Sequence, residues 1–231
     1  VDIGGVPFSP EVAAVGEAEE LDRVLPVVTE VAASCDVVIS VDTFRPEVAR
    51  QCVAAGASVV NDTSGLRDPA IAEVVADSGA TLVITHSTTG PGVRGPAPVY
   101  GDVVDDVRAF LESRVELAGR LGVPEDRLVI DPGHDLNKNT LHSLELTRRL
   151  DEVAEIGLPL IAAVSNKDFV GEATGLRKAE RGAASIAAAA VCVLQGARIL
   201  RMHDVPAARS AADMLAVILG LQEPAYLRHN L

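Results

Sequence analysis

The chain has 231 residues, of which 48% are hydrophobic and only 3% are aromatic, so aliphatic side chains must build its core. Acidic residues outnumber basic ones by 33 to 20, and the net charge of −13 excludes nucleic acid and anionic membranes as main partners, because both require a basic face. The length suits one large domain, which we expect to span residues 1–231.

Seven short apolar runs, rich in Val and Ile and ending in polar or Gly residues, predict β-strands. Their nearly continuous apolarity is typical of strands that are buried on both faces of a parallel sheet. In chain order, these runs begin at Val1, Val37, Ala57, Thr81, Arg127, Pro159 and Arg198.

Helical patterns separate these runs. The first places Leu21, Val24, Leu25 and Val28 on one helix face. It also contains Pro26, which a helix tolerates only near its first turn. Further helices are predicted within 45–56, 100–122, 140–157 and 179–197. A Gly-Ala pair precedes three of the strands and predicts a helix C-cap that leads directly into a strand, at Gly56, Gly79 and Gly196.

Alternating strands and helices without a linker indicate one α/β domain. Two architectures compete, an open doubly wound sheet and a (β/α)8 barrel. The first strand is not followed by G-x-G-x-x-G, which argues against a dinucleotide-binding open sheet. Seven strands in a chain that starts on a strand favour a (β/α)8 TIM barrel whose first βα unit is partly or wholly missing; complete barrels have about 250 residues.

In such a barrel the C-terminal ends of the strands share one mouth, where the chemistry takes place. Carboxylates and an Asn amide at this mouth can pair with a flat amide–amidine edge, and Lys and Arg suit a carbonyl oxygen or an anionic leaving group. The strand ends supply Asp2, Asp42, Asn61, Asp62, His86, Asp131, Ser165, Lys167, Arg201, His203 and Asp204.

The segments ISVDT, VVNDTSG, LVIDPG, SNKDFVG and RILRMHDV resemble the strand-end motifs of the dihydropteroate synthase family, in the right order and over essentially the whole chain. The resemblance implies a TIM barrel and a transferase of folate biosynthesis. Such an enzyme displaces pyrophosphate from 6-hydroxymethyl-7,8-dihydropterin pyrophosphate and attaches p-aminobenzoate, in a reaction that resembles SN1. The small-molecule partners would thus be a pterin and an arylamine.

The resemblance also implies roles for individual residues. Asp42, Asn61 and Asp131 would bind the amino-pyrimidine edge of the pterin, and Lys167 would reach its carbonyl and ring nitrogen. Ser165 would contact the carboxylate of p-aminobenzoate. Arg201 would stack on the pterin and, with His203, hold the pyrophosphate, so the catalytic residues would be Lys167, Arg201 and His203.

Four positions depart from the family pattern. Phe8 and Ser9 replace a Thr-Arg pair, Leu136 replaces an aromatic residue, and Asn166 replaces an Arg. These changes put the synthase activity in doubt. Loss of a cation where an anion departs costs factors of about 10² or more in rate. The segments DPGHDLNKNTLH and SNKD resemble the second, divergent actinobacterial paralogue, which is generally regarded as lacking normal activity.

Three functions therefore remain open. The first is a synthase with impaired activity, and the second is a pterin-binding protein that has lost catalysis. The third, a pterin-binding methyltransferase module with a corrinoid partner, is the weakest, because SNKDFVG and RMHDV resemble the synthase pattern better.

The remaining expectations concern metal, assembly and location. The resemblance implies Mg²⁺, whose Asn ligand in the family would lie upstream of Val1, so no metal ligand is assigned. It also implies a homodimer that uses the Ala-rich helix from Ala183. Three widely spaced Cys residues favour a reduced, cytoplasmic protein, and no apolar stretch suits a bilayer. For His134, Asp135 and His142 we expect loop and helix-cap roles, and for 87–101 a surface loop or a lid.

Overall fold

Seven parallel strands alternate with helices in the computed structural model, which describes residues 1–9, 11 and 13–229. Each strand lies inside one of the seven apolar runs, so the sequence prediction of the strands is confirmed. They are β1 (Asp2–Gly4), β2 (Ser40–Asp42), β3 (Val59–Asp62), β4 (Thr81–Thr85), β5 (Leu128–Asp131), β6 (Ile161–Ala162) and β7 (Ile199–Leu200).

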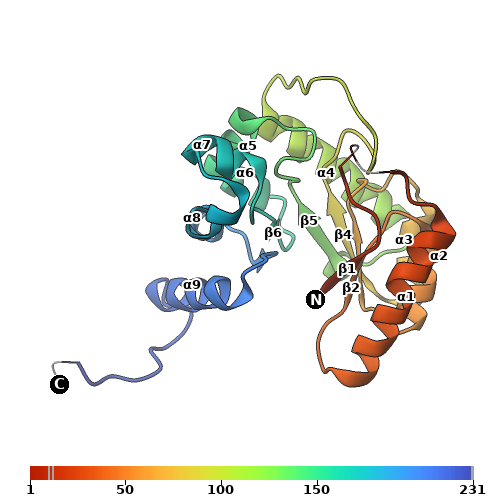
Figure 1. Cartoon of the computed structure of the whole chain (residues 1–231), viewed down its shortest axis with the longest axis horizontal. Coiled ribbons are helices and arrows are strands. Elements are labelled where there is room, and N and C mark those ends of the chain that lie inside the picture. Colours follow the sequence, from red (N-terminus) through yellow and green to blue (C-terminus); the bar gives the residue numbers. More distant parts are fainter. Residues whose placement is uncertain (10, 12, 230–231) are drawn as a thin grey trace.

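The helices lie between and after the strands, on the outside of the sheet (Figure 1). Two short 3₁₀ helices, Glu125–Arg127 and Lys178–Glu180, accompany them. The helices are α1 (Glu17–Ser34), α2 (Pro46–Ala54), α3 (Ala70–Ser78), α4 (Val103–Arg120), α5 (Thr140–Arg148), α6 (Leu150–Ala154), α7 (Asp168–Thr174), α8 (Gly182–Leu194) and α9 (Val205–Ile218).

Two helix predictions need correction. Pro26 lies in the interior of α1, far beyond its first turn, with its ring on the exposed side of the helix. The predicted helix within 140–157 is instead two helices, α5 and α6, which meet at the non-helical residue Arg149. The three Gly caps are confirmed, because Gly56, Gly79 and Gly196 all have positive φ, which costs Gly little.

The strand order decides between the two architectures. Strands β1 to β5 pair in chain order, β6 pairs with β7, and a bridge between Ile130 and Leu160 joins the two groups. A doubly wound sheet would reverse its order at a switch point, whereas a barrel winds in one direction. The prediction of a (β/α)8-type architecture is thus confirmed. No closing ladder between β7 and β1 is present in the part of the chain that the structure describes.

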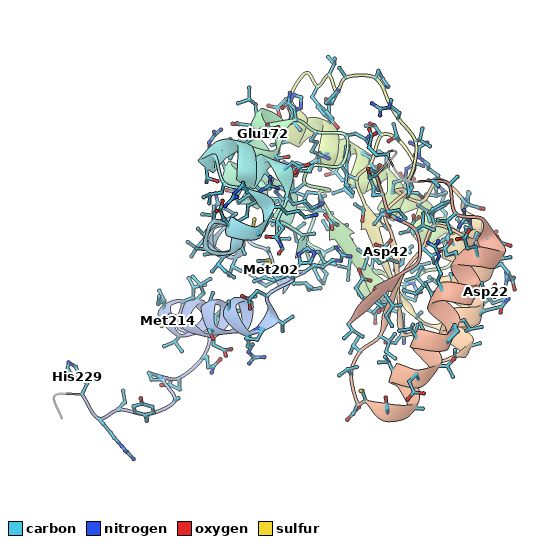
Figure 2. The ribbon with its side chains drawn as sticks, viewed as in Figure 1. Asp22, Asp42, Glu172, Met202, Met214 and His229 are labelled. Carbon is cyan, nitrogen blue, oxygen red and sulfur yellow. The ribbon has the colours of Figure 1, made fainter. Side chains whose placement is uncertain are left out.

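The strands follow an arch, with β1 at one end and β7 at the other (Figure 1). The two ends are joined by side chains. Arg201, just after β7, donates from Nε to Asp2 Oδ2 on β1 at 2.6 Å. Asp42 lies on the inner side of the arch, whereas Asp22 points outward from α1 (Figure 2).

The core has an outer and an inner part. The outer part fills the space between strands and helices, with fully buried residues such as Leu82, Ile84 and Ile130. The inner part, which we call the floor, consists of Val83, Val129, Ile161 and Ala163. Because side chains alternate along a strand, residues two positions beyond the floor also point inward. No helix among the described residues is long and apolar enough to cross a membrane.

Candidate functional site

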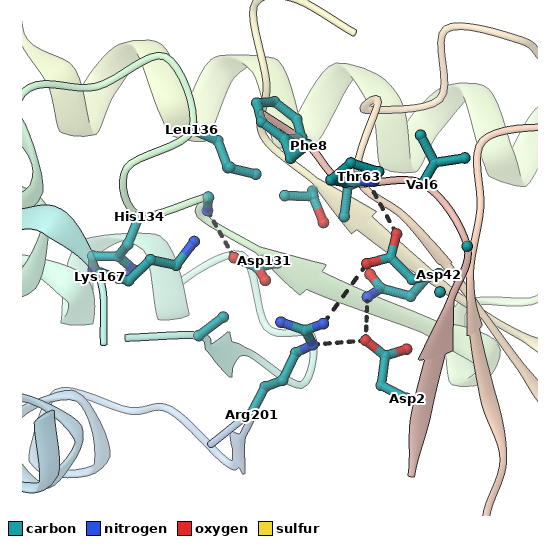
Figure 3. A pocket seen from close by; sticks show the side chains of 17 residues that line it. Asp2, Val6, Phe8, Asp42, Thr63, Asp131, His134, Leu136, Lys167 and Arg201 are labelled. Carbon is teal, nitrogen blue, oxygen red and sulfur yellow. Dashed lines mark hydrogen bonds and ion pairs between the residues drawn. The ribbon is translucent and has the colours of Figure 1, made fainter. Parts of the chain in front are cut away.

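A cavity of about 570 Å³ lies above the floor, at the C-terminal ends of the strands (Figure 3). This is the face on which barrel enzymes carry their chemistry. Six of the strand-end residues predicted from the sequence line it. They are Asp2, Asp42, Asn61, Asp131, Lys167 and Arg201.

Main-chain register places two of these side chains together. Asp42 and Asn61 are direct partners on the neighbouring strands β2 and β3, so their side chains leave the sheet on the same face. Asn61 donates from Nδ2 to Asp2 Oδ2 at 3.1 Å, which orients the amide. Its Oδ1 is buried and has no hydrogen-bond partner in the described structure. The amide oxygen is thus available to a donor on a ligand.

Asp131 ends β5, one level above the floor residue Val129. Its Oδ1 accepts a 2.7 Å hydrogen bond from the Gly133 amide, and the residue is only 6% exposed. Burial raises the pKa of Asp131, whereas Lys167, Arg201 and Lys138 oppose the rise. A buried carboxyl of this kind gains most from a ligand that donates hydrogen bonds to it.

Asp42 lies in a similar environment, although its surroundings are richer in charge. Burial and the neighbouring Asp2 carboxylate raise the pKa of Asp42 to about 7, against the lowering effect of Arg201. The Arg201 guanidinium lies 3.7 Å from Asp42 Oδ2, and Thr63 donates to Asp42 Oδ1 at 3.3 Å. Asp42 can therefore exchange a proton near neutral pH.

Two cations, Lys167 and Arg201, enter the cavity from the side that lies opposite Asp42 (Figure 3). Lys167 precedes α7, and burial lowers its pKa while Asp131 and Asp135 raise it. The Arg201 side chain is 47% exposed and pairs with Asp2 and Asp42. The cavity is thus lined by three carboxyl groups, of Asp2, Asp42 and Asp131, and by two cations, Lys167 and Arg201.

Ser165 and His203 lie outside the lining of this cavity. They bind each other, with His203 Nδ1 2.8 Å from Ser165 Oγ and the His203 amide donating to the same oxygen at 3.2 Å. Ser165 is buried, whereas His203 is exposed. The contacts assigned to them from the sequence stay predictions.

Most of the apolar lining lies on two loops that we call the mouth loops, residues 5–9 and 133–138. Phe8 and Leu136 both line the cavity (Figure 3). The Gly92 amide donates to the Phe8 carbonyl at 3.0 Å, and Asn137 accepts from the Thr89 amide at 2.9 Å. The segment 87–101, expected as a surface loop or a lid, thus supports both mouth loops.

The other two departures from the family pattern lie outside the lining. Ser9 is exposed, and Asn166 has a positive φ of 57° with its amide bound to Ser185 Oγ.

His134 contributes more than the loop role expected from its sequence. It is 1% exposed and lines the cavity. Thr147 donates its hydroxyl proton to the Ser143 carbonyl, so it accepts from His134 Nε2 at 3.1 Å. Burial, with the charges of Lys138 and Lys167, lowers the pKa of His134 to about 3. Its Nδ1 is therefore an unprotonated acceptor, and it has no partner in the described structure.

The cap roles of the two neighbouring residues are confirmed. Asp135 Oδ2 accepts from the Asp168 and Phe169 amides at the start of α7. His142 completes a capping box with Asn139 at the start of α5. The sequence places Asp2 at the mouth without giving it a role, and it does not indicate Lys138. A charged residue in a polar loop gives little signal of its own.

The described residues do not fit the magnesium ion that the family resemblance implies. They include no group of three or more His, Cys, Asp or Glu side chains arranged to hold a metal ion. Two carboxylates of the cavity, Asp2 and Asp42, are both paired with Arg201.

Comparisons with known proteins agree with this geometry. A model of the family described as "Pterin binding enzyme" matches residues 1–203. An "Inactive dihydropteroate synthase 2" of Mycobacterium leprae is 40% identical over 97% of this chain and 79% of its own length. The dihydropteroate synthase of Escherichia coli is 34% identical over 96% of this chain and 79% of its own length.

Solved structures give the same result. Dihydropteroate synthase from Stenotrophomonas maltophilia superposes with a TM-score of 0.90 at 40% identity, over 96% of this chain and 82% of that one. The enzyme from Xanthomonas albilineans, in complex with 7,8-dihydropteroate, gives 0.84 at 39% identity over 96% and 79%. The chain therefore belongs to the pterin-binding enzyme family, as a dihydropteroate synthase-like protein of folate biosynthesis.

Proposed function

We propose that this cavity binds 6-hydroxymethyl-7,8-dihydropterin pyrophosphate and that the chain condenses it slowly with p-aminobenzoate. The observation that carries the proposal is the meeting of Asp42, Asn61, Asp131 and Lys167 around one cavity. Solved relatives support the choice of ligands, since those of Xanthomonas albilineans hold 7,8-dihydropteroate in one case and 4-aminobenzoic acid in another.

The acidic side of the cavity suits the pterin edge. The ring N–H and the amino group of a pterin are donors, and Asp131, Asp42 and the free Asn61 oxygen are acceptors. Lys167 faces them as a donor and would bind the pterin carbonyl oxygen and a ring nitrogen. Because the ring is held from both sides, its exocyclic methylene group would point towards the mouth.

The proposed reaction then takes place at that methylene group. The bond from the methylene carbon to the pyrophosphate oxygen breaks, and the electron pair leaves with the pyrophosphate. Arg201 and His203 would hold the departing anion, and the pterin ring would stabilise the methylene cation. The p-aminobenzoate amine attacks this carbon, with Ser165 on its carboxylate, and loses a proton to water.

A second function, pterin binding without turnover, is favoured by the mouth loops. Phe8 and Leu136 place apolar groups where a departing anion would pass. Among the described residues that line the cavity, only Lys167 and Arg201 are cationic, and both face carboxylates. Missing electrostatic stabilisation of a leaving group lowers rates by about 10² or more.

Calorimetry with 6-hydroxymethylpterin, together with an assay of pyrophosphate release, tests both functions. We expect wild-type protein to bind the pterin and Asp131→Asn to weaken binding about 100-fold, because an isosteric amide has no negative charge and presents an NH2 donor in place of one of the two acceptor oxygens. Asp126→Asn, in an exposed 3₁₀ turn, is the matched control. Binding that is absent or indifferent to Asp131 contradicts the proposal. Binding without pyrophosphate release selects the second function.

We also propose a homodimer that uses α8 and α9. These helices pack on each other and leave apolar side chains exposed. Sedimentation of the protein at several concentrations measures the association, which four substitutions to Asp would abolish. The residues are Val191, Leu194, Met214 and Ile218.

A further inference from the structure

Lys138 is a buried cation to which neither the sequence nor the proposed reaction assigns a role. It is 7% exposed and lies on the loop after β5. Its Nζ lies 2.7 Å from His86 Nδ1, 3.0 Å from the Gly133 carbonyl and 3.2 Å from the Leu136 carbonyl. A protonated lysine has three N–H donors, and here each of them has an acceptor.

His86 is a suitable partner because it is held as an acceptor. Burial and the Lys138 charge lower the pKa of His86 to about 2, so its imidazole is neutral. Its ring packs edge-on against Phe110 with 4.8 Å between centroids. Its backbone amide donates to the Asp131 carbonyl at 2.8 Å. His86, at the end of β4, therefore contacts both Lys138 through its ring and Asp131 through its amide. Because Lys138 and Asp131 lie at the two ends of the same loop, Lys138 links the loop back to the residue where it starts.

The loop has little freedom to compensate for loss of this contact. Gly133 has φ of 68°, and a Cβ atom there would lie 2.1 Å from the His86 carbonyl oxygen. The same Gly133 donates its amide to Asp131 Oδ1. A change in the Lys138 contacts would thus be transmitted through Gly133 to the carboxyl group of Asp131.

We propose that Lys138 is a positioning residue whose buried ammonium group fixes the loop from Gly133 to Lys138 and favours the carboxylate form of Asp131. The inference rests on the proposed function in one respect, namely that Asp131 accepts hydrogen bonds from the edge of the pterin ring. Lys138 acts through Asp131 and does not itself line the cavity.

Electrostatics support the assignment. The ionisable groups that face Lys138 are His86, Asp131, His134, Asp135, His142 and Lys167. Burial lowers the pKa of Lys138 to about 7, and the Asp131 charge opposes that shift. The effect is reciprocal, since Lys138 lowers the pKa of Asp131. Each charge is therefore easier to bury in the presence of the other.

The first experiment compares Lys138→Met with Lys178→Met, which removes an exposed lysine beside α8. The Asp131 carboxyl is titrated by ¹³C NMR without ligand, and 6-hydroxymethylpterin binding is measured by calorimetry from pH 5 to 9. We expect Lys138→Met to raise the Asp131 pKa and to move the acid limb of binding to higher pH, with about a tenfold loss at pH 7. An Asp131 titration equal to that of the control overturns the inference.

A second measurement needs no variant, in case Lys138→Met does not fold. In wild-type protein, the Lys138 Nζ is followed by ¹⁵N NMR together with the Asp131 carboxyl. The proposal predicts that the Asp131 signal responds at the pH where Lys138 loses its proton. Independent titrations contradict it. Absence of pterin binding would instead contradict the proposed function and leave the NMR result for Lys138 intact.

Discussion

Asp42 and Asn61 are partners in a parallel ladder, whereas Phe8 and Leu136 lie on the two mouth loops, which the segment 87–101 supports. The first pair cannot move without breaking main-chain hydrogen bonds, and a register shift would turn both side chains away from the cavity. The second pair is free of that constraint. This difference explains how the strand side of the cavity can match the family pattern while the mouth loops depart from it.

The largest effect is expected at Gly133, which connects the end of β5 to the mouth loop 133–138. Gly133→Ala should destabilise the protein by at least about 3 kcal/mol, because the residue has a positive φ and its Cβ would collide with the His86 carbonyl. Urea unfolding measures the change. Gly119→Ala, inside α4 with open space around it, is the control and should be neutral or slightly stabilising. Equal stability of the two variants would show that the contact is not rigid.

A change at the mouth should affect turnover and leave binding in place. The double variant Phe8→Thr, Ser9→Arg restores the polar and cationic groups of the family pattern. We expect pyrophosphate release to rise about 100-fold, since a cation near the leaving anion stabilises the transition state. Affinity for 6-hydroxymethylpterin should change less than threefold. The single variants serve as controls, and no gain in turnover would show that the changes at Phe8 and Ser9 do not limit the proposed reaction.

The pH dependence of pterin binding tests the role of Asp42, which lies on the strand β2. Burial raises the pKa of Asp42 to about 7, so the folded state binds this proton more tightly than the unfolded chain. The contribution of Asp42 to the free energy of unfolding therefore falls as the pH rises from about 4 to about 7. Over the upper part of this range Asp42 becomes a carboxylate, which is the form that accepts hydrogen bonds from the donors of a pterin.

Arg201→Gln removes the charge that holds this pKa down. The midpoint of pterin affinity against pH should then move upward, by calorimetry from pH 5.5 to 9. Arg209→Gln, an exposed residue on α9, should leave the midpoint unchanged. An unaltered midpoint for Arg201→Gln would mean that another group controls the titration.

The sequence is informative where one physical signal dominates. Short apolar runs rich in Val and Ile predict the seven strands, and polar residues at their ends predict Asp42, Asn61, Asp131, Lys167 and Arg201 as neighbours. The break at Arg149 has no such signal, because residues 140–157 carry apolar side chains at helical spacing throughout.

His134 and Lys138 lie in a polar loop segment that looks exposed in the sequence. His134 is buried against Thr147, near the end of α5, and Lys138 against His86, at the end of β4. No local sequence pattern specifies these two long-range contacts.

The contact between the first and last strands consists of a half-exposed guanidinium on a carboxylate. Such a pair weakens as ionic strength rises, whereas the ladders elsewhere in the arch do not. Among the contacts between strands, salt concentration therefore acts mainly on the one that joins β1 to the end of β7. If Arg201 turns towards a bound anion, it must release Asp2, and occupancy of the cavity then becomes coupled to the separation of β1 and β7.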